Sequence, residues 1–426
     1  MLSSFASDTP SGDRWHPIAR CPMNGPSRTW IPVMLLGALL SGCLSPLAMH
    51  RAVLQYDETV RQVEAEMLLL NIARARHGLP IHFTGVSSVA ATFDFRTQAG
   101  FGAQLFENGG PVFAKNFYTL NLGASVAENP TIGIVPIQGE EFTKRILTPI
   151  DEAKFDFLMT QGIEPAIIVR LLARGIAVEE GERRAFFLNL PHRRNEYAEF
   201  RRRVLHLSAL NLARHLHVGP IEYEEPWPLP LDHPLTTQAF AKGYRWITDE
   251  AGGASQLSRR VIGRIAVTNY PLSSLSNEER QRLQQKAERH AGNYVLVDVR
   301  PGHPGGDYPW HGQIKLRSFN AIVHFVARGI ADEPEFEVNR HSRTGPVLRN
   351  PDTTLKVYES SSPQFPAAFS ITLEDRWYAV GRNGTPPEEE SERAWNREAF
   401  AVLAQLYQMT VTDVGRVLTP PITIAK

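Results

Sequence analysis

The chain has 426 residues, a length that suggests two or three domains. Apolar residues make up 42% and charged residues 21%, which allows packed cores with solvated surfaces and excludes wholesale disorder. Lys plus Arg and Asp plus Glu each number 45, so no overall electrostatic field would attract nucleic acid. Two cysteines are too few for a disulfide framework or a cysteine-rich zinc site.

A short apolar segment near the N-terminus predicts the location of the protein. Residues 31–40 are mostly apolar, but ten residues are too few to span a bilayer as a helix. Arg28 precedes the segment and small residues follow it, as in a secretory signal. The segment ends Leu40-Ser41-Gly42-Cys43, which closely resembles the lipobox of bacterial lipoproteins. The resemblance implies cleavage before Cys43 and acylation there; an ordinary signal peptide or a buried core segment is the alternative.

The signal also bounds the mature chain. Residues 1–22 are polar and fit the signal poorly, so we expect translation to start at Met23 and residues 1–42 to be absent from the folded protein. The mature chain, 43–426, then has Cys43 as its single cysteine, with lipid such as palmitate on it, which leaves no disulfide or thiol nucleophile. Residue 44 is Leu rather than Asp, which among similar lipoproteins of two-membrane bacteria implies export to the outer membrane. Triple acylation would anchor the chain stably.

Residues 50–77 are predicted to form one long helix, because apolar residues recur there at alternating steps of three and four. Gly78 and Pro80 end it. The predicted apolar stripe consists of Val53, Tyr56, Val60, Val63, Met67 and Leu70. It either packs against the helix's own domain or forms a coiled-coil or oligomer face.

The apolar period changes to two in residues 88–126. Odd-numbered residues are mostly apolar from Val89 to Leu105 and even-numbered ones from Val112 to Val126, with a turn composition at 107–111 between them. This pattern predicts a long β-hairpin, in which paired residue numbers must sum to an odd value to join the apolar faces. Sums of 219 and 217 fit equally. The hairpin either packs one face on a helix layer or spans a membrane, where other protomers must pair with its edges.

The whole pattern is α+β: a long N-terminal helix, a long antiparallel β-hairpin, a helical middle region and a mixed α+β C-terminal region. Four prolines between 226 and 234 form a stiff connection, which predicts a boundary between domains 43–225 and 235–426. Before it we expect a strand at 131–137 and helices at 140–147, 151–160, 164–174 and 194–216. After it we expect strands at 261–267, 293–299, 335–339, 354–359, 367–373 and 376–381, and helices at 277–290, 317–329 and 388–409.

Several segments resemble a family of proteobacterial outer-membrane lipoproteins of unknown function. They are Leu68–Arg76, Phe83–Ser88, Glu128–Ile132, Gly139–Phe142 and Leu316–Phe319. They are spread along most of the mature chain. Since the family has no known activity, the resemblance implies no catalytic residue.

Motifs that would indicate a reaction are missing. The sequence has no His-Glu-x-x-His, no Gly-x-Ser-x-Gly, no Walker loop and no Gly-x-Gly-x-x-Gly. We therefore assign no catalytic, cofactor-binding or metal-binding residue. Two histidine groups remain as weak candidates. His206, His215 and His217 lie near the end of helix 194–216, where the last two diverge and cannot chelate together. His303, Asp307 and His311 lie in the Gly/Pro-rich loop 301–312, where they either bind zinc or simply face water.

One basic cluster is interleaved with glutamates. It consists of Arg183, Arg184, Arg193, Arg194, Arg201, Arg202 and Arg203. We interpret it as a solvated helix face; the alternative is contact with phosphate-bearing envelope lipid, since Arg binds phosphate through two hydrogen bonds.

These patterns predict an outer-membrane lipoprotein whose body faces the periplasm and serves as a structural or assembly component of a cell-envelope complex. Its partners would be the outer membrane, through the lipid, and envelope proteins or further copies of itself, not nucleic acid. One alternative is an oligomeric export pore built from hairpin 88–126. Another is a periplasmic enzyme that uses loop 301–312.

We predict that Cys43→Ser abolishes lipidation and leaves unprocessed protein, because the acyl chain is attached to that sulfur. Acyl labelling and membrane fractionation check this. Labelling and fractionation identical to those of the unaltered protein would contradict it.

Overall fold

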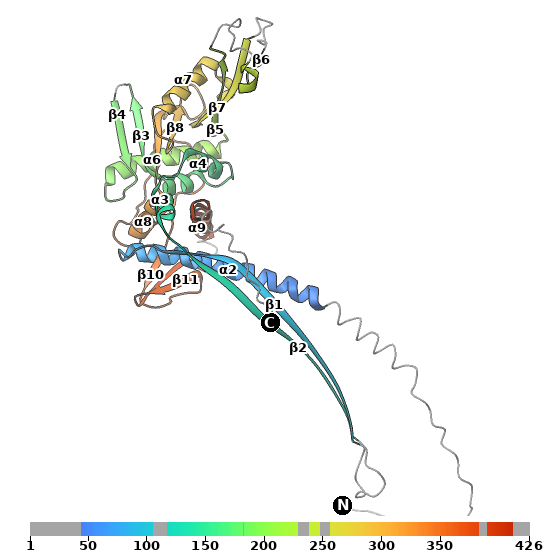
Figure 1. The fold of residues 1–426 in the computed structure, drawn as a ribbon. Helices are drawn as coiled ribbons and strands as arrows, with labels where there is room; N and C mark the ends of the chain where they lie inside the picture. Colours follow the sequence, from blue (N-terminus) through green and yellow to red (C-terminus); the bar gives the residue numbers. More distant parts are fainter. Residues whose placement is uncertain are drawn as a thin grey trace, which may run out of the picture. The chain divides into compact units, whose positions relative to one another are not determined.

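The computed structural model describes residues 44–104, 117–181, 183–228, 238–247, 256–382 and 390–411 (Figure 1). The signal segment, Cys43 and the turn predicted at 107–111 lie outside this range. The described residues form the predicted α+β fold, with eight α-helices, a seven-stranded mixed sheet and two small sheets. None of these helices is both long and apolar enough to cross a membrane. The pattern of contacts divides the chain between Thr59 and Val60.

Helix α2 (Leu44–Arg76) confirms the predicted long helix, but the predicted apolar stripe was wrong. Val53 and Val63 are exposed, whereas Leu69 and Ile72 are completely buried. The described side chains of α2 that enter the core are Ala65, Leu68, Leu69, Ile72 and Ala73. These residues also recur at steps of one, three and four, so two stripes coexist in the sequence and only packing selects between them.

The predicted long hairpin forms from β1 (Phe83–Gln104) and β2 (Phe117–Ile137), which pair antiparallel. The strand predicted at 131–137 is the end of β2. Paired numbers sum to 221 from Ser88 with Gly133 onward, which is odd as required but neither of the two sums considered. Phe83 and Ile137, at the base of the hairpin, are buried in the core, so the body holds both strands at this end.

The helical middle region is confirmed. Its helices are α3 (Glu140–Leu147), α4 (Glu152–Met159), α5 (Pro165–Leu172) and α6 (Arg194–Leu212). Asp151 caps α4 by accepting a hydrogen bond from the backbone N–H of Lys154, and Pro165 begins α5. Helix α6 buries Tyr197, Phe200, Val204 and Leu207.

Three strands in this region escaped prediction. They are β3 (Ala173–Glu180), β4 (Arg183–Leu188) and β5 (His217–Pro226). Strand β3 is buried along most of its length and follows α5 directly, so its apolar residues look like a continuation of the helix. Strand β4 is an edge strand whose side chains are largely exposed, which removes the alternation that sequence reasoning requires.

The central sheet has the order β4-β3-β9-β8-β7-β5, with β6 (Arg245–Ile247) added to β7. Its other strands are β7 (Gln256–Thr268), β8 (Tyr294–Val299) and β9 (Trp310–Leu316). Only β7 and β8 pair in parallel. Strands from both sides of the Pro-rich connection belong to this one sheet.

The two faces of the sheet differ. One carries Ile176, Val297 and Ile314 into the main core with α6. The other is covered by α7 (Asn277–Glu288), which contacts β5, β7 and β8 (Figure 1). Over β9 this second face carries the half-buried polar residues His311 and Lys315.

The C-terminal region is mixed α+β, as predicted, with two corrections. Its elements are α8 (Phe319–Gly329), β10 (Tyr358–Ser360), β11 (Ala367–Leu373), β12 (Arg376–Arg382) and α9 (Glu390–Val411). The strand predicted at 354–359 shrinks to β10. The strand predicted at 335–339 is irregular chain, because Glu335 leaves the surface for a buried cluster of arginines.

This cluster, which we call the Glu335 cluster, consists of Glu335, Arg170, Arg201 and Tyr197. Arg170 Nη2 lies 3.1 Å from Glu335 Oε1, and the Tyr197 hydroxyl donates to the same oxygen over 2.7 Å. Arg201 donates to the Tyr197 oxygen over 3.0 Å. Burial alone would raise the pKa of Glu335, but the charges of Arg170 and Arg201 hold that pKa below its usual value.

The two guanidinium groups also fix an irregular segment. Arg170 donates to the carbonyl oxygens of Pro351 and Asp352 at 2.9 and 2.6 Å, and Arg201 donates to the same two carbonyls. Thr354 donates its hydroxyl to Glu335 over 2.7 Å. The cluster therefore binds residues 335–354, which have almost no regular structure, to helices α5 and α6.

We predict that Glu335→Gln lowers the free energy of unfolding by about 3–5 kcal/mol, because two buried guanidinium groups lose their counter-charge. Urea unfolding measures this. The matched control is Glu141→Gln, an exposed partner of Arg145, which should change stability by less than about 0.5 kcal/mol. Equal effects of the two substitutions would show that the buried charge is unimportant.

Candidate functional site

The predicted loop 301–312 connects β8 to β9 only up to Pro309, because its last three residues begin β9. Residues at both of its ends meet a buried carboxylate near the end of β8. Asp298 and His311 face each other across the two strands. His311 Nδ1 lies 2.7 Å from Asp298 Oδ1. Arg300 Nε donates to Oδ2 over 2.6 Å, and the Tyr270 hydroxyl donates to the same oxygen. One carboxylate thus organises three side chains from three segments, and we call this group the Asp298 cluster.

Asp298 is ionised in this setting although it is only 4% exposed. Burial raises the pKa of the carboxyl, but hydrogen bonds from His311 and Tyr270 and the charge of Arg300 outweigh burial and hold the pKa at about 2. Burial and the nearby Asp298 charge raise the pKa of Tyr270 well above its usual value, so the phenol keeps its proton.

The His311–Asp298 pair has the geometry by which a carboxylate fixes the tautomer and orientation of an imidazole. The His311 side chain is 42% exposed, so a molecule at the surface can reach it. Nucleophilic catalysis would further require a hydroxyl within hydrogen-bond reach of the histidine. Among the described residues no hydroxyl is hydrogen-bonded to His311, and His311 lines none of the cavities described below.

The structure does not bring His303, Asp307 and His311 together around a common point. His303 is exposed and lies against the Tyr270 ring at a centroid distance of 4.9 Å. Asp307 is exposed, and only its backbone oxygen is engaged, by Arg343. His311 points to Asp298 instead. No group of three or more His, Cys, Asp or Glu side chains in the described ranges is placed to hold a metal ion.

The loop is a tightly built element of the fold. Asn269 donates to the carbonyls of Arg300 and Pro304 over 2.9 and 3.0 Å, and it accepts from the backbone N–H of Arg300. A Cβ atom at Gly306 would lie 2.2 Å from the Arg300 oxygen, so only glycine fits there. The Tyr308 hydroxyl donates to Glu199 over 2.6 Å. These contacts give the shape of the loop a structural explanation that needs no ligand.

The second histidine group is brought together only in part. His206 is buried in α6, and burial lowers its pKa to about 4, so it is neutral at physiological pH. The helix predicted to reach residue 216 ends at Leu212, and His217 begins β5. His206 and His215 both line a cavity of about 310 Å³, whereas His217 is not part of its lining.

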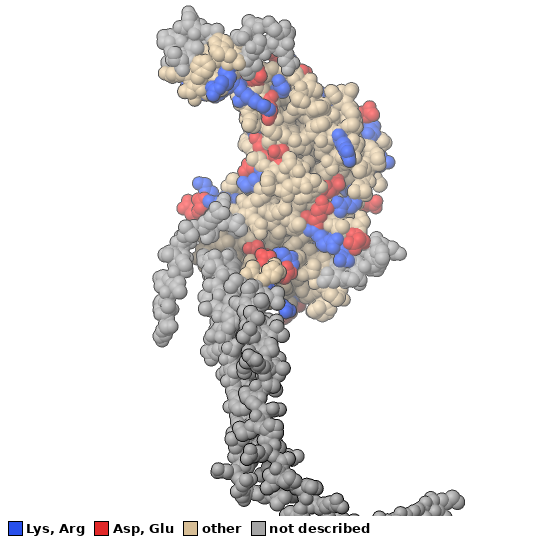
Figure 2. All heavy atoms as spheres, turned by 90° about the vertical axis from the view of Figure 1, so that its right-hand side faces the viewer, with Lys and Arg blue, Asp and Glu red and all other residues tan. Residues whose placement is uncertain are grey.

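The basic cluster proves to be several different environments. Arg183 and Arg184 lie on strand β4 rather than on a helix. Arg201 belongs to the Glu335 cluster, and Arg203 donates to the Pro309 carbonyl over 2.5 Å while it lies over the Tyr308 ring. A solvated helix face was therefore the wrong interpretation for Arg201 and Arg203. On the face of the body in Figure 2, basic and acidic side chains lie next to one another.

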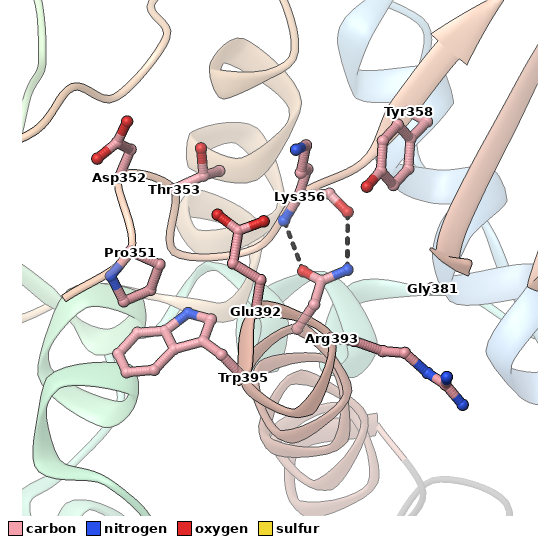
Figure 3. Close-up of a pocket in the computed structure, with 10 residues that line it drawn as sticks. Pro351, Asp352, Thr353, Lys356, Tyr358, Gly381, Glu392, Arg393 and Trp395 are labelled. Carbon is pink, nitrogen blue, oxygen red and sulfur yellow. Dashed lines mark hydrogen bonds between the residues drawn. The ribbon is translucent and has the colours of Figure 1, made fainter. Parts of the chain in front are cut away.

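A small polar cavity of about 130 Å³ lies between residues 351–358 and the start of α9 (Figure 3). Asn396 bridges it by accepting from the backbone N–H of Lys356 and donating to its oxygen. The Trp395 indole donates to the Thr354 carbonyl over 3.0 Å. Charged side chains of both signs line the cavity. Its volume is below that of typical small-molecule sites. We therefore interpret the hydrogen bonds around it as contacts that hold residues 351–358 against α9.

A larger groove of about 560 Å³ runs between α2, α9, β11 and β12. Its floor is apolar and includes Leu68, Phe369 and Phe400, while Arg61 and Arg397 are on its lining as well. The Arg61 guanidinium lies 5.5 Å from the centre of the Phe369 ring. Glu64 and Gln408, whose side chains are hydrogen-bonded over 3.4 Å, also line the groove, so its lining combines apolar and polar groups.

The hairpin offers the remaining functional surface. In the described part of the chain, β1 and β2 form a sheet of only two strands. Each strand therefore has one edge whose backbone N–H and C=O groups find no partner strand there. A two-stranded hairpin is at best marginally stable alone in water. Such edges are sites at which another strand can be added.

We predict that Asp298→Asn weakens the acid dependence of stability. The folded pKa of Asp298, about 2, is below the ordinary value of 3.8. Ionised Asp298 therefore contributes about 2 kcal/mol to the free energy of unfolding. This contribution is complete at pH values above the ordinary pKa and is lost as pH falls toward the folded pKa. Urea unfolding measured over about pH 2–6 should show a smaller loss of the free energy of unfolding in the variant as pH falls. Asp332→Asn, an exposed control, should retain the slope. A slope unchanged by Asp298→Asn would refute the assignment.

No family model, no curated protein and no solved structure matches this chain.

Proposed function

We propose that the protein is a lipid-anchored outer-membrane lipoprotein, and that it acts as a structural or assembly component of a cell-envelope complex with its body facing the periplasm. The lipobox-like segment ending at Cys43 supports the anchor. The resemblance to proteobacterial lipoproteins of unknown function supports the location. The proposal assigns no catalytic residue and no cofactor.

The observation that carries the assembly role is the isolated two-stranded hairpin. Strand β1 has 22 residues and β2 has 21, far more than the usual strand of five or six. A sheet of this length with two unpaired edges exposes a long template for pairing with another chain, which proteins usually block. A hairpin that is kept open at both edges is therefore suited to receive strands from partners.

The body supports this role through its rigidity. The irregular segment 335–354 is held by the Glu335 cluster, and the loop 301–312 is held by the Asp298 cluster and Asn269. The charged groups of these two clusters are engaged in the fold and do not converge on a cavity. Such a body can position a binding element, and the base of the hairpin at Phe83 and Ile137 is fixed in its core.

An export pore is the second candidate, and the register favours it. The register pairs odd residues of β1 with even residues of β2 from Phe95 with Val126 to Ala103 with Tyr118. In the sequence these positions are apolar apart from Thr97, while intervening positions include Arg96, Gln98 and Asn121. The band covers nine residues on each strand, which is within the length of a membrane-spanning strand.

The enzyme alternative has the weakest support. The His311–Asp298 pair is well oriented, but no hydroxyl in the described part of the chain is hydrogen-bonded to His311, and His311 lines none of the cavities described above. We therefore assign the pair no reaction.

We predict that full-length protein in mild detergent forms a particle heavier than one chain, and that shortening the hairpin reduces it to a monomer. The variant replaces residues 94–127 by a two-residue Asn-Gly turn, so the pair Phe93–Glu128 closes the shortened hairpin. Native mass spectrometry measures the particle.

The matched control is Phe186→Lys on β4, the free edge of the central sheet, where Phe186 is 40% exposed. It should leave the mass unchanged. Near-ultraviolet circular dichroism shows whether each variant keeps its folded body. A monomer before shortening, or a particle that survives shortening, would contradict the assembly role of the hairpin.

A further inference from the structure

We propose that the partner of each hairpin is another copy of this chain, joined head to tail, with the outer edge of β2 pairing with the outer edge of β1 in the next copy. This inference rests on the proposed assembly function and names its partner. Its physical basis is the hydrogen-bonding capacity of the two edges and the direction in which the strands run.

Both edges of the hairpin are long, and each has backbone N–H and C=O groups without a partner strand in the described structure. In an antiparallel pair, alternate residues direct both backbone groups toward the partner strand, and the residues between direct theirs outward. Strands of 22 and 21 residues thus present outward-directed groups on roughly ten residues each. A fitting partner must supply a strand of comparable length at each edge. A second copy of this chain has strands of the same length, because its sequence is the same.

The direction of the strands decides how copies join. Strand β1 leaves the core at Phe83 and β2 returns to it at Ile137, so both ends of the hairpin are at its own body. Copies anchored in one membrane leaflet through Cys43 would have their bodies on the same side. A β2 edge then meets the neighbouring β1 edge antiparallel, whereas two β1 edges would meet in parallel, which is slightly less favourable.

Symmetry leads to the same arrangement. Joining two β1 edges makes a closed dimer in which both β2 edges stay unpaired. Joining β2 to β1 of the next copy is a heterologous contact, which repeats until a ring closes and every edge is paired. The head-to-tail arrangement is therefore the one that satisfies all the backbone groups at both edges.

The test uses single-cysteine chains, since Cys43 is the only cysteine of the mature chain and its sulfur carries lipid. One tagged chain carries Arg96→Cys in β1. A second, differently tagged chain carries a cysteine in β2 at position 121, 123, 125 or 127. These odd-numbered residues of β2 pair with even-numbered residues of β1, so they lie on the same face of the hairpin as residue 96. The two chains are co-expressed, and membranes are treated with a short thiol cross-linker.

We expect a cross-linked pair that contains both tags for at least one β2 position, and no pair when either chain is expressed alone. Glu141→Cys, on the exposed side of α3, should give no cross-link with any partner. A pair formed between two Arg96→Cys chains would overturn the head-to-tail arrangement. The four β2 positions allow for different staggers between neighbouring copies.

Native mass separates this inference from the assembly function. A heavy particle that gives no cross-link between copies, and that contains a second protein, would overturn self-association but leave the assembly function intact. A protein that is monomeric in the membrane extract would overturn both. A ring of defined mass with mixed-tag cross-links supports both.

Discussion

The buried Glu335 cluster is the interaction on which the arrangement of the body depends. The Glu335 carboxylate, on a side chain only 4% exposed, pairs directly with Arg170 and is linked to Arg201 through the Tyr197 hydroxyl. Both guanidinium groups also donate to the backbone carbonyls of Pro351 and Asp352. A charge in this position is tolerated only when it is paired and fully hydrogen-bonded, because transfer from water is costly. The same requirement forces residues 335–354 against α5 and α6, although that segment has little regular structure of its own.

The Asp298 cluster applies the same principle at the end of the central sheet. A buried carboxylate collects Tyr270, Arg300 and His311, and the loop 301–312 takes its shape around them. This explains why a loop rich in glycine, proline and histidine looked like a possible metal site. Its polar residues are directed to a carboxylate of β8 and to backbone carbonyls, so their spacing reflects the path of the loop rather than a common ligand.

The hairpin differs from the body in what it leaves unsatisfied. The carboxylates of Glu335 and Asp298 find partners within the chain, whereas β1 and β2 pair only with each other in the described structure. Burial of Phe83 and Ile137 holds the base of the hairpin but supplies nothing to its edges. This contrast is the reason for placing the interaction surface on the hairpin and for treating the body as its support.

The sequence by itself determined the features that depend on local periodicity and composition. Apolar residues at helical spacing predicted α2 and α6, and period two predicted the β1–β2 hairpin and the odd parity of its register. The lipobox resemblance likewise rests on a few adjacent residues. These signals are short-range, so no knowledge of the partner segments is needed to recognise them.

Only the tertiary structure decided features that depend on distant residues. It selected which stripe of α2 is buried, since Leu68 and Leu69 compete with Met67 and Leu70 for the core. It revealed β3 and β4, whose burial is set by their place in the sheet, and it turned Arg201 and Arg203 inward from an apparently solvated cluster. The pairs Arg170–Glu335 and Asp298–His311 join residues that no local pattern connects. The residues next to a charged side chain in the sequence do not show which side chain will pair with it in the fold.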